Sequence, residues 1–165
     1  MGESLVSLGE ADYACGYFPE RTSRTEQFFA FSYSPGELER WLENGYRHFG
    51  YYFFRPVCGD CHRCIPLRVP LDTWVPTASA RRLAAANRQL TVSFAGIGPS
   101  RESFALYAKH KERFKDKDPG SFDTYAESFF TNTPGSGMLT IHDGARLAAV
   151  SHFDAAGTVL SAVYC

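Results

Sequence analysis

Helical patterns occur in four stretches of the chain, and in two of them, from Ser34 and from Ser100, apolar residues recur at helical spacing. In the first, Ser34-Pro35-Gly36-Glu37 supplies an N-cap serine, a proline in the first turn and a glutamate at the third helical position. Leu38, Trp41 and Leu42 follow on one face, and Gly45 marks the end. The other three predicted helices run from Thr77 or Ser79 to about Leu90, from Ser100 to about Lys115, and from Ser121 to Phe130.

Strand patterns dominate the last part of the chain. The turn sequences Asp143-Gly144 and Ala155-Ala156-Gly157 divide it into three segments of strand-forming residues, which predicts an antiparallel meander. The three predicted strands are Met138 to His142, Arg146 to Phe153, and Thr158 to Tyr164. Three earlier strands are predicted at His48 to Arg55, Pro66 to Val69, and Thr91 to Phe94. Helices followed by an antiparallel meander indicate the α+β class.

Four consecutive aromatic residues, Tyr51 to Phe54, have two interpretations. Aromatic rings on an exposed strand stack on the bases of single-stranded nucleic acid. Aromatic residues in succession also form strands that are buried on both faces. We favour the buried strand.

The composition is that of a globular chain: of 165 residues, 44% are hydrophobic, 21% charged and 15% aromatic. This length suits one domain or two small ones. No apolar stretch approaches the ~18 residues of a membrane-spanning helix. The N-terminal segment MGESLVSLGE also lacks the basic and apolar regions of a signal peptide. We therefore expect a cytoplasmic protein without a membrane partner.

Charge is distributed unevenly, although the net charge is only -1. Residues 1–46 hold three basic and eight acidic side chains, whereas residues 47–100 hold seven arginines, no lysine and two aspartates. Guanidinium groups bind phosphates and carboxylates through paired hydrogen bonds. The arginine-rich stretch therefore indicates either a surface for such ligands or a solvated face that balances the acidic N-terminal stretch.

Four cysteines point to a metal or cluster site. Cys58, Cys61 and Cys64 form a C-x2-C-x2-C run, which in a reducing compartment is typical of metal ligation. A tetrahedral site needs a fourth ligand, for which Cys15 is the first candidate and His62 the alternative. The spacing suits Zn²⁺ and a [4Fe–4S] cluster alike. The structural alternative is a set of buried free thiols.

Several sequence blocks, in order along the chain, resemble the aminoacyl-tRNA–protein transferases. The block Cys15-Gly16-Tyr17-Phe18-Pro19-Glu20-Arg21 resembles their C-x-Y-L-P-x-R motif. The block from Arg55 to Val69 is similar to the bacterial R-P-x-C-x-x-C-x-x-C-x-P-x-R-V motif almost residue for residue. Further matches are Asn44-Gly45-Tyr46-Arg47-His48, Pro76 with Ser79, Arg81 and Arg82, and Gly144 to Tyr164, which ends in Ser161-Ala162-Val163-Tyr164. The family includes eukaryotic arginyltransferases and bacterial aspartate/glutamate leucyltransferases.

The resemblance implies an acyltransferase. Such enzymes move an aminoacyl group, Leu or Arg, from charged tRNA to the N-terminal α-amine of proteins that begin with Asp or Glu. The product is marked for degradation in the N-end rule pathway. The donor is already an activated ester, so the reaction needs no ATP. The implied partners are aminoacyl-tRNA and acceptor proteins with an acidic N-terminus.

The resemblance also implies two domains. Residues 1–76 would form a small Cys-rich domain with a structural or regulatory Zn²⁺ or [4Fe–4S] site held by Cys15, Cys58, Cys61 and Cys64. Residues 77–165 would form an acetyltransferase-like (GNAT) domain. Family members continue past the S-A-V-Y block, so we expect this domain to be incomplete at its C-terminus.

Arginine is the expected reader of both tRNA phosphates and an acidic N-terminal residue. The candidates are Arg55, Arg68, Arg81, Arg82 and Arg88. No catalytic base is assigned: Tyr17, His48 and His142 are possible by residue type only, and we expect structural roles for each.

Two other functions fit the same residues. The chain could be a catalytically inactive metal- or iron–sulfur-binding module that binds tRNA or protein. It could also be an iron–sulfur regulator that controls a partner.

Overall fold

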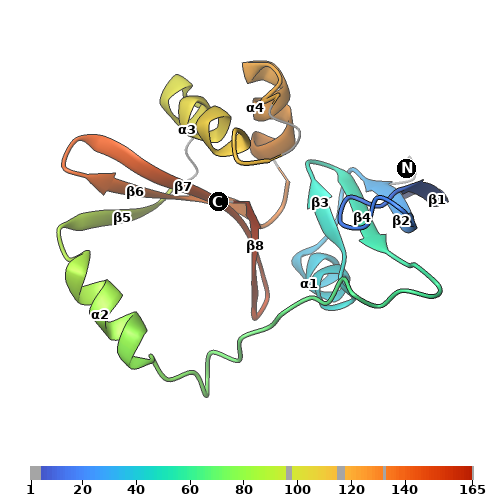
Figure 1. Ribbon diagram of the computed structural model, residues 1–165, viewed down its shortest axis with the longest axis horizontal. Coiled ribbons are helices and arrows are strands. Elements are labelled where there is room, and N and C mark those ends of the chain that lie inside the picture. Colours follow the sequence, from blue (N-terminus) through green and yellow to red (C-terminus); the bar gives the residue numbers. More distant parts are fainter. Residues whose placement is uncertain (1–4, 96–97, 115–117, 132, 165) are drawn as a thin grey trace.

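Two four-stranded antiparallel sheets make up the computed structural model, which describes residues 5–95, 98–114, 118–131 and 133–164 (Figure 1). In the first sheet the strand order is β1-β2-β4-β3. Helix α1 (Pro35–Glu43) connects β2 to β3 and packs against the sheet through Leu38 and Leu42. The strands of this sheet are β1 (Leu5–Ala14), β2 (Thr22–Ala30), β3 (Arg47–Phe49) and β4 (Tyr52–Pro56).

The core of the first sheet is aromatic. Phe53 is fully buried, and its ring stacks on Phe28 with the centroids 5.1 Å apart. Trp41 of α1 meets the Phe53 ring edge-on at 4.8 Å. Ala156 and Val159, which come from the end of the chain, belong to the same apolar cluster. The first sheet is therefore completed by residues from the second.

The second sheet has the order β5-β6-β7-β8. Helices α3 and α4 lie over one of its faces (Figure 1), and α3 packs on β7. Helix α2 precedes β5 and buries none of its residues. The elements are α2 (Ala78–Ala86), β5 (Leu90–Ala95), α3 (Arg101–Lys111), α4 (Phe122–Phe130), β6 (Ser136–Asp143), β7 (Arg146–Ala156) and β8 (Val159–Tyr164).

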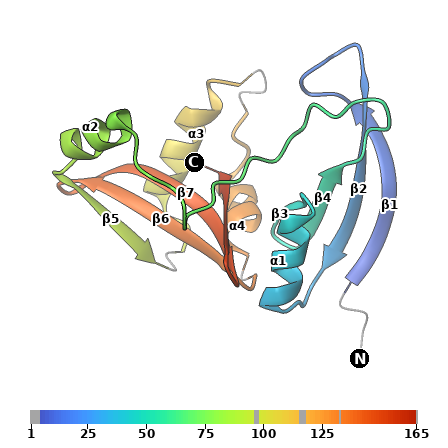
Figure 2. The ribbon, with the colours of Figure 1, turned by 90° about the horizontal axis from the view of Figure 1, so that it is seen from below.

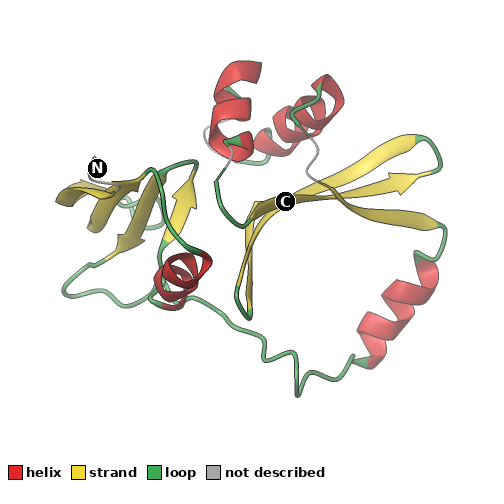
Figure 3. Cartoon of the chain, turned by 180° about the vertical axis from the view of Figure 1, so that it is seen from behind, coloured by secondary structure: helices red, strands yellow, loops and turns green. Residues whose placement is uncertain are grey.

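A long coil, residues 57–77, joins the first sheet to α2 (Figure 2). It contains no helix or strand (Figure 3). Apolar residues such as Leu67 and Leu71 lie 89% and 74% exposed along it. Across the described ranges, no helix has the length and apolar character that crossing a bilayer requires.

The four predicted helices and the C-terminal meander are confirmed, as is the α+β class. Ser34 and Glu37 form the predicted capping box, and Thr77, Ser100 and Ser121 cap the other helices. Helices α2 and α3 end earlier than predicted, at Ala86 and Lys111.

Two strand predictions are wrong, and two strands were not predicted. The single strand predicted at His48 to Arg55 is a hairpin, because Gly50 adopts a φ of 55° and reverses the chain between β3 and β4. Of the four aromatic residues there, only Phe53 is fully buried. Pro66 to Val69 is coil, since no strand pairs with it. Strands β1 and β2 have no counterpart among the predicted elements.

Candidate functional site

The sheet topology brings the predicted cysteine ligands to one end of the first sheet. Strands β1 and β4 pair antiparallel with opposite sides of β2, so their C-terminal ends flank the start of β2. Cys15 follows β1, and Cys58 follows β4. The Val57 N–H donates to the Arg24 carbonyl at 2.8 Å, which extends the β4 pairing to the edge of the cysteine loop.

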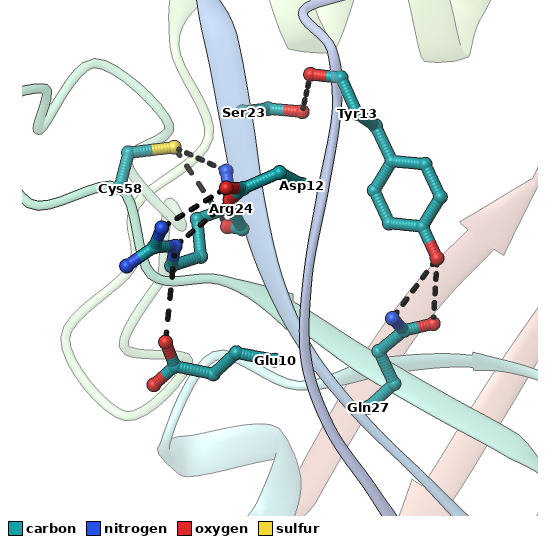
Figure 4. A network of polar contacts seen from close by, with 7 residues as sticks. All are labelled: Glu10, Asp12, Tyr13, Ser23, Arg24, Gln27 and Cys58. Atoms are coloured by element: carbon teal, nitrogen blue, oxygen red, sulfur yellow. Dashed lines mark hydrogen bonds and ion pairs between the residues drawn. The ribbon is translucent and has the colours of Figure 1, made fainter.

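Cys58 is anchored on the backbone of Arg24 (Figure 4). Its Sγ accepts the Arg24 N–H at 3.3 Å and lies 3.8 Å from the Arg24 carbonyl oxygen. The Arg24 guanidinium in turn donates to both carboxylate oxygens of Asp12, at 2.8 and 3.0 Å. This hydrogen bonding lowers the pKa of Asp12. The cysteine loop is thus fastened to β2, and β2 to β1.

The Cys64 thiol interacts electrostatically with the other three predicted cysteine ligands. Partial burial raises the pKa of the Cys64 thiol, and the negative charges of Cys58, Cys15 and Cys61 raise it further. Within the described ranges, however, no three His, Cys, Asp or Glu side chains are arranged as a ligand set. Metal ligation by these thiols stays a prediction.

The five candidate arginines fall into two groups. Arg55 and Arg68 meet at the C-terminal end of α1, where Arg55 Nη1 donates to the Asn44 carbonyl at 3.4 Å and Arg68 Nη2 donates to the Glu43 carbonyl. Cations at this end of a helix complement its dipole. Arg55 also forms an ion pair with Glu26, at 2.7 Å. Both arginines therefore hold the first sheet, α1 and the coil together.

The second group lies on exposed α2 and the turn that follows it. Arg81 donates to the Pro76 carbonyl at 2.6 Å, and Arg82 donates to Ser79 Oγ at 3.0 Å. Arg81, Arg82 and Arg88 are all exposed. No carboxylate forms an ion pair with these three guanidinium groups among the described residues. Their charges face solvent and are available to a polyanion.

A buried histidine–aspartate pair joins the two sheets. His48 Nε2 of β3 and Asp154 Oδ1 of β7 are 3.0 Å apart, and the two side chains are 4% and 2% exposed. The contact is short, but His48 Nε2 and Asp154 Oδ2 have no hydrogen-bond partner among the described residues. His48 Nδ1 lies 2.8 Å from the Gly50 carbonyl oxygen, and Ser136 Oγ donates to Asp154 Oδ1 at 2.9 Å. The burial of His48 agrees with the structural role that we expected for it, whereas Tyr17, for which we expected the same, is 81% exposed.

A second polar contact fixes the same junction. Glu39 of α1 accepts hydrogen bonds from the N–H and the hydroxyl of Thr158, at 2.9 and 2.8 Å. These bonds lower the pKa of Glu39. Sequence reasoning assigned no role to Asp154 or Glu39. An aspartate within the mostly apolar strand β7 was the one available signal for Asp154.

Comparison with known proteins shows which family the sequence is similar to. Residues 13–82 match the family model "Arginine-tRNA-protein transferase, N terminus". An aspartate/glutamate leucyltransferase of Polynucleobacter necessarius is 30% identical over 174 residues, covering 98% of this chain and 68% of the relative. One from Pseudomonas putida F1 is 31% identical over 158 residues, covering 92% and 66%. One from Methylobacillus flagellatus is 29% identical over 159 residues, covering 92% and 63%.

The chain thus spans about two thirds of the length of these curated relatives. The similarity extends through both sheets, because it includes the cysteine loop and continues over nearly the whole chain. The chain belongs to the family of aminoacyl-tRNA–protein transferases.

Proposed function

We propose that this protein transfers an aminoacyl group from charged tRNA to the N-terminal α-amine of proteins that begin with Asp or Glu. The observation that carries the proposal is that relatives named aspartate/glutamate leucyltransferase align with 92% to 98% of the chain. Their name favours leucine over arginine as the donor amino acid.

The chemistry requires little from the protein beyond positioning. The attacking α-amine has a pKa of about 7.7–8.0, so a useful fraction is neutral at pH 7. Its nitrogen forms an amide bond with the aminoacyl carbonyl carbon, and the ester bond to the tRNA ribose breaks. The proton lost by the amine balances the one gained by the ribose oxygen. Orientation and stabilisation of the tetrahedral oxyanion then account for the rate.

The exposed arginines of α2 are the proposed contact for the tRNA backbone. Arg81, Arg82 and Arg88 have no carboxylate partner among the described side chains, whereas Arg55 is engaged by Glu26. Each phosphate contact adds about 0.7 to 0.9 to the slope of log affinity against log salt. Replacing Arg81 by glutamine should lower the magnitude of that slope by about 0.7 to 0.9, the share of one phosphate contact, whereas replacing Arg55 should leave the slope unchanged.

The cysteine loop is the proposed site of a structural or regulatory Zn²⁺ or [4Fe–4S] group. Cys15, Cys58, Cys61 and Cys64 lie close enough for their charges to interact, and thiolate sulfur is the preferred ligand of both groups. Such a group would brace the end of the first sheet and supply no step of the aminoacyl transfer. Metal analysis of the purified protein, together with its visible absorbance, distinguishes zinc from a cluster.

We also propose that the second sheet is the first part of an acetyltransferase-like (GNAT) domain that begins near residue 77. One strand, two helices and a three-stranded antiparallel meander follow each other in the order β5-α3-α4-β6-β7-β8. This order supports the proposal, as does the position of the coil before α2. A crystal structure of one of the longer relatives would test it.

The deciding experiment is transfer of labelled leucine or arginine from charged tRNA to a peptide that begins with Asp or Glu. The matched control is the same peptide with an acetylated N-terminus, which removes the nucleophile. Transfer that depends on the free acidic N-terminus supports the proposal. Salt-dependent tRNA binding without transfer would instead identify a binding module.

A further inference from the structure

A pocket of about 150 Å³ lies between helices α3 and α4 and strands β7 and β8. Its walls include Leu106 and Tyr107 of α3, Tyr125 of α4, and Ala148 and Val150 of β7. Neither the cysteine loop nor the candidate arginines contribute to its lining. The functions proposed above therefore leave this pocket unassigned.

Small side chains on strand β7 create the space for this pocket. Alternate residues of a strand point to the same face, so Val150 and His152 both point toward the helices, and Ala148, at a bulge in the pairing of β7 with β6, also lines the pocket. The His152 ring fixes this assignment, since it stacks on Phe129 of α4 at 4.5 Å. The small side chains of Ala148 and Val150 leave room that longer ones would fill.

The lining holds no permanently charged side chain; its polar members are Ser103, two histidines (His110 and His152) and three tyrosines. It contains no Asp, Glu, Lys or Arg, and burial lowers the pKa of His152 to about 4, so that ring is neutral at pH 7. A guanidinium group placed here would lose its hydration without finding a counter-charge. A branched apolar side chain would instead leave water for an apolar wall.

The size agrees with this chemistry. An apolar cavity of about 150 Å³ can hold a benzene molecule, which is larger than the isobutyl group of leucine. A second cavity, beside His48 and Asp154, has about 20 Å³. That volume holds about one water molecule and no amino-acid side chain.

We propose that the pocket between α3, α4, β7 and β8 binds the leucyl side chain of the aminoacyl donor. The proposal rests on the proposed function, because leucyl-tRNA must be the donor for the pocket to be used. It makes Val150 and Ala148 specificity-determining residues. It also gives a structural reason for leucine, rather than arginine, as the transferred residue.

Binding of stable donor analogues tests the pocket without catalysis. The probes are 3′-leucylamido-, 3′-glycylamido- and 3′-arginylamido-3′-deoxyadenosine, titrated calorimetrically into the protein. The leucyl analogue should bind at least about tenfold tighter than the glycyl analogue, since each methylene in an apolar pocket is worth about tenfold or more. The arginyl analogue should bind no tighter than the glycyl one. Equal binding of the leucyl and glycyl analogues would overturn the proposal.

Filling the pocket provides the second arm. Val150→Phe should reduce leucyl binding to the level of the glycyl analogue, and the smaller change Ala148→Leu should weaken it while disturbing the fold less. The matched control is Val92→Phe on β5, where the side chain is 51% exposed and lies outside the pocket. Circular dichroism establishes that each variant is folded. Leucyl preference that survives both pocket changes would place the side chain elsewhere and refute the assignment.

The transfer assay, run in parallel, distinguishes the two proposals. Leucine transfer without any leucyl preference in analogue binding would remove the pocket assignment and leave the proposed function intact. Leucyl preference that Val150→Phe abolishes, in a protein that transfers nothing, would keep the pocket and remove the proposed function.

Discussion

Replacing Asp154 by alanine should destabilise the protein far more than the same change at an exposed aspartate. Asp154 is 1% exposed, and its carboxylate faces His48 at 3.0 Å while it accepts the Ser136 hydroxyl at 2.9 Å. Alanine removes both contacts and leaves the His48 Nε2 and the Ser136 hydroxyl without this partner. Loss of one member of a buried pair costs about 3–5 kcal/mol.

That cost is a large share of the free energy of unfolding. Domains are typically stable by about 5–15 kcal/mol, so the variant would retain a fraction of its stability. At about 1.4 kcal/mol per factor of ten, the folded-to-unfolded ratio falls by about two to four orders of magnitude. The control is Asp143→Ala, because Asp143 pairs with Arg146 at 3.3 Å in an exposed turn. Exposed pairs contribute about 0–1 kcal/mol.

Urea unfolding followed by tryptophan fluorescence measures both values. Trp41 packs on Phe28 and Phe53 in the shared core, so its emission reports loss of the junction where Asp154 lies. Asp154→Asn, which keeps the volume and an acceptor oxygen, separates the charge from the cavity. If Asp154→Ala costs no more than Asp143→Ala, the buried pair does not hold the two sheets together and our reasoning is wrong.

Three further predictions test other parts of the structure. Gly135→Ala should destabilise the fold by at least about 1 kcal/mol more than Gly144→Ala. Both glycines have positive φ, but a Cβ on Gly135 would lie 2.6 Å from the Ala155 carbonyl oxygen, whereas Gly144 has open space. Urea unfolding of the two variants measures the difference in stability, and equal losses would refute the prediction. Burial lowers the pKa of His152 from 6.5 to about 4, so as the pH falls this histidine takes up a proton in the unfolded chain before it does so in the folded protein. The stability should therefore be full above about pH 6.5 and fall by up to about 3 kcal/mol toward pH 4. In pH-dependent thermal melts, His152→Gln should flatten this loss of stability. Cys15→Ser should release bound zinc or cluster and lower the melting temperature, since ligation is coupled to folding; unchanged metal content, measured by mass spectrometry, would show that the fourth ligand is another group.

Local signals in the sequence predicted the helices well. The capping box of α1 is complete, with Glu37 N–H donating to Ser34 Oγ at 3.3 Å and Ser34 N–H donating to Glu37 Oε2 at 2.8 Å. A cap involves residues only three apart, so the sequence contains the whole interaction. The turn at Asp143-Gly144 was predictable for the same reason.

The strands were less predictable where pairing, rather than burial, decides them. Strand β1 is exposed at almost every residue, so it shows no alternation of inner and outer positions and is held by its hydrogen bonds to β2. Residues Ile65, Leu67, Val69 and Leu71 do alternate with polar or proline neighbours, but no strand pairs with them and they remain coil. Alternation predicts a strand only where a partner exists.

The candidate site also combines features that a short stretch of sequence predicts with features that only the folded chain creates. The Cys58-x2-Cys61-x2-Cys64 run was visible in the sequence, and the sheet topology explains how Cys15 comes near it. The contact between Glu39 and Thr158 joins residues 119 positions apart. The pocket below α3 and α4 depends on four elements at once. Neither feature has a signature in any short stretch of sequence.

The contribution of Ala156 and Val159 to the first core has a consequence during synthesis. A ribosome adds about 5–20 residues per second, so the 119 residues between Glu39 and Thr158 take roughly 6–24 s to translate. For most of that interval the rings around Phe53 lack the hairpin residues that cover them in the folded protein. The nascent chain should therefore present an aromatic surface that chaperones recognise, and release from them should follow the emergence of the β7–β8 turn.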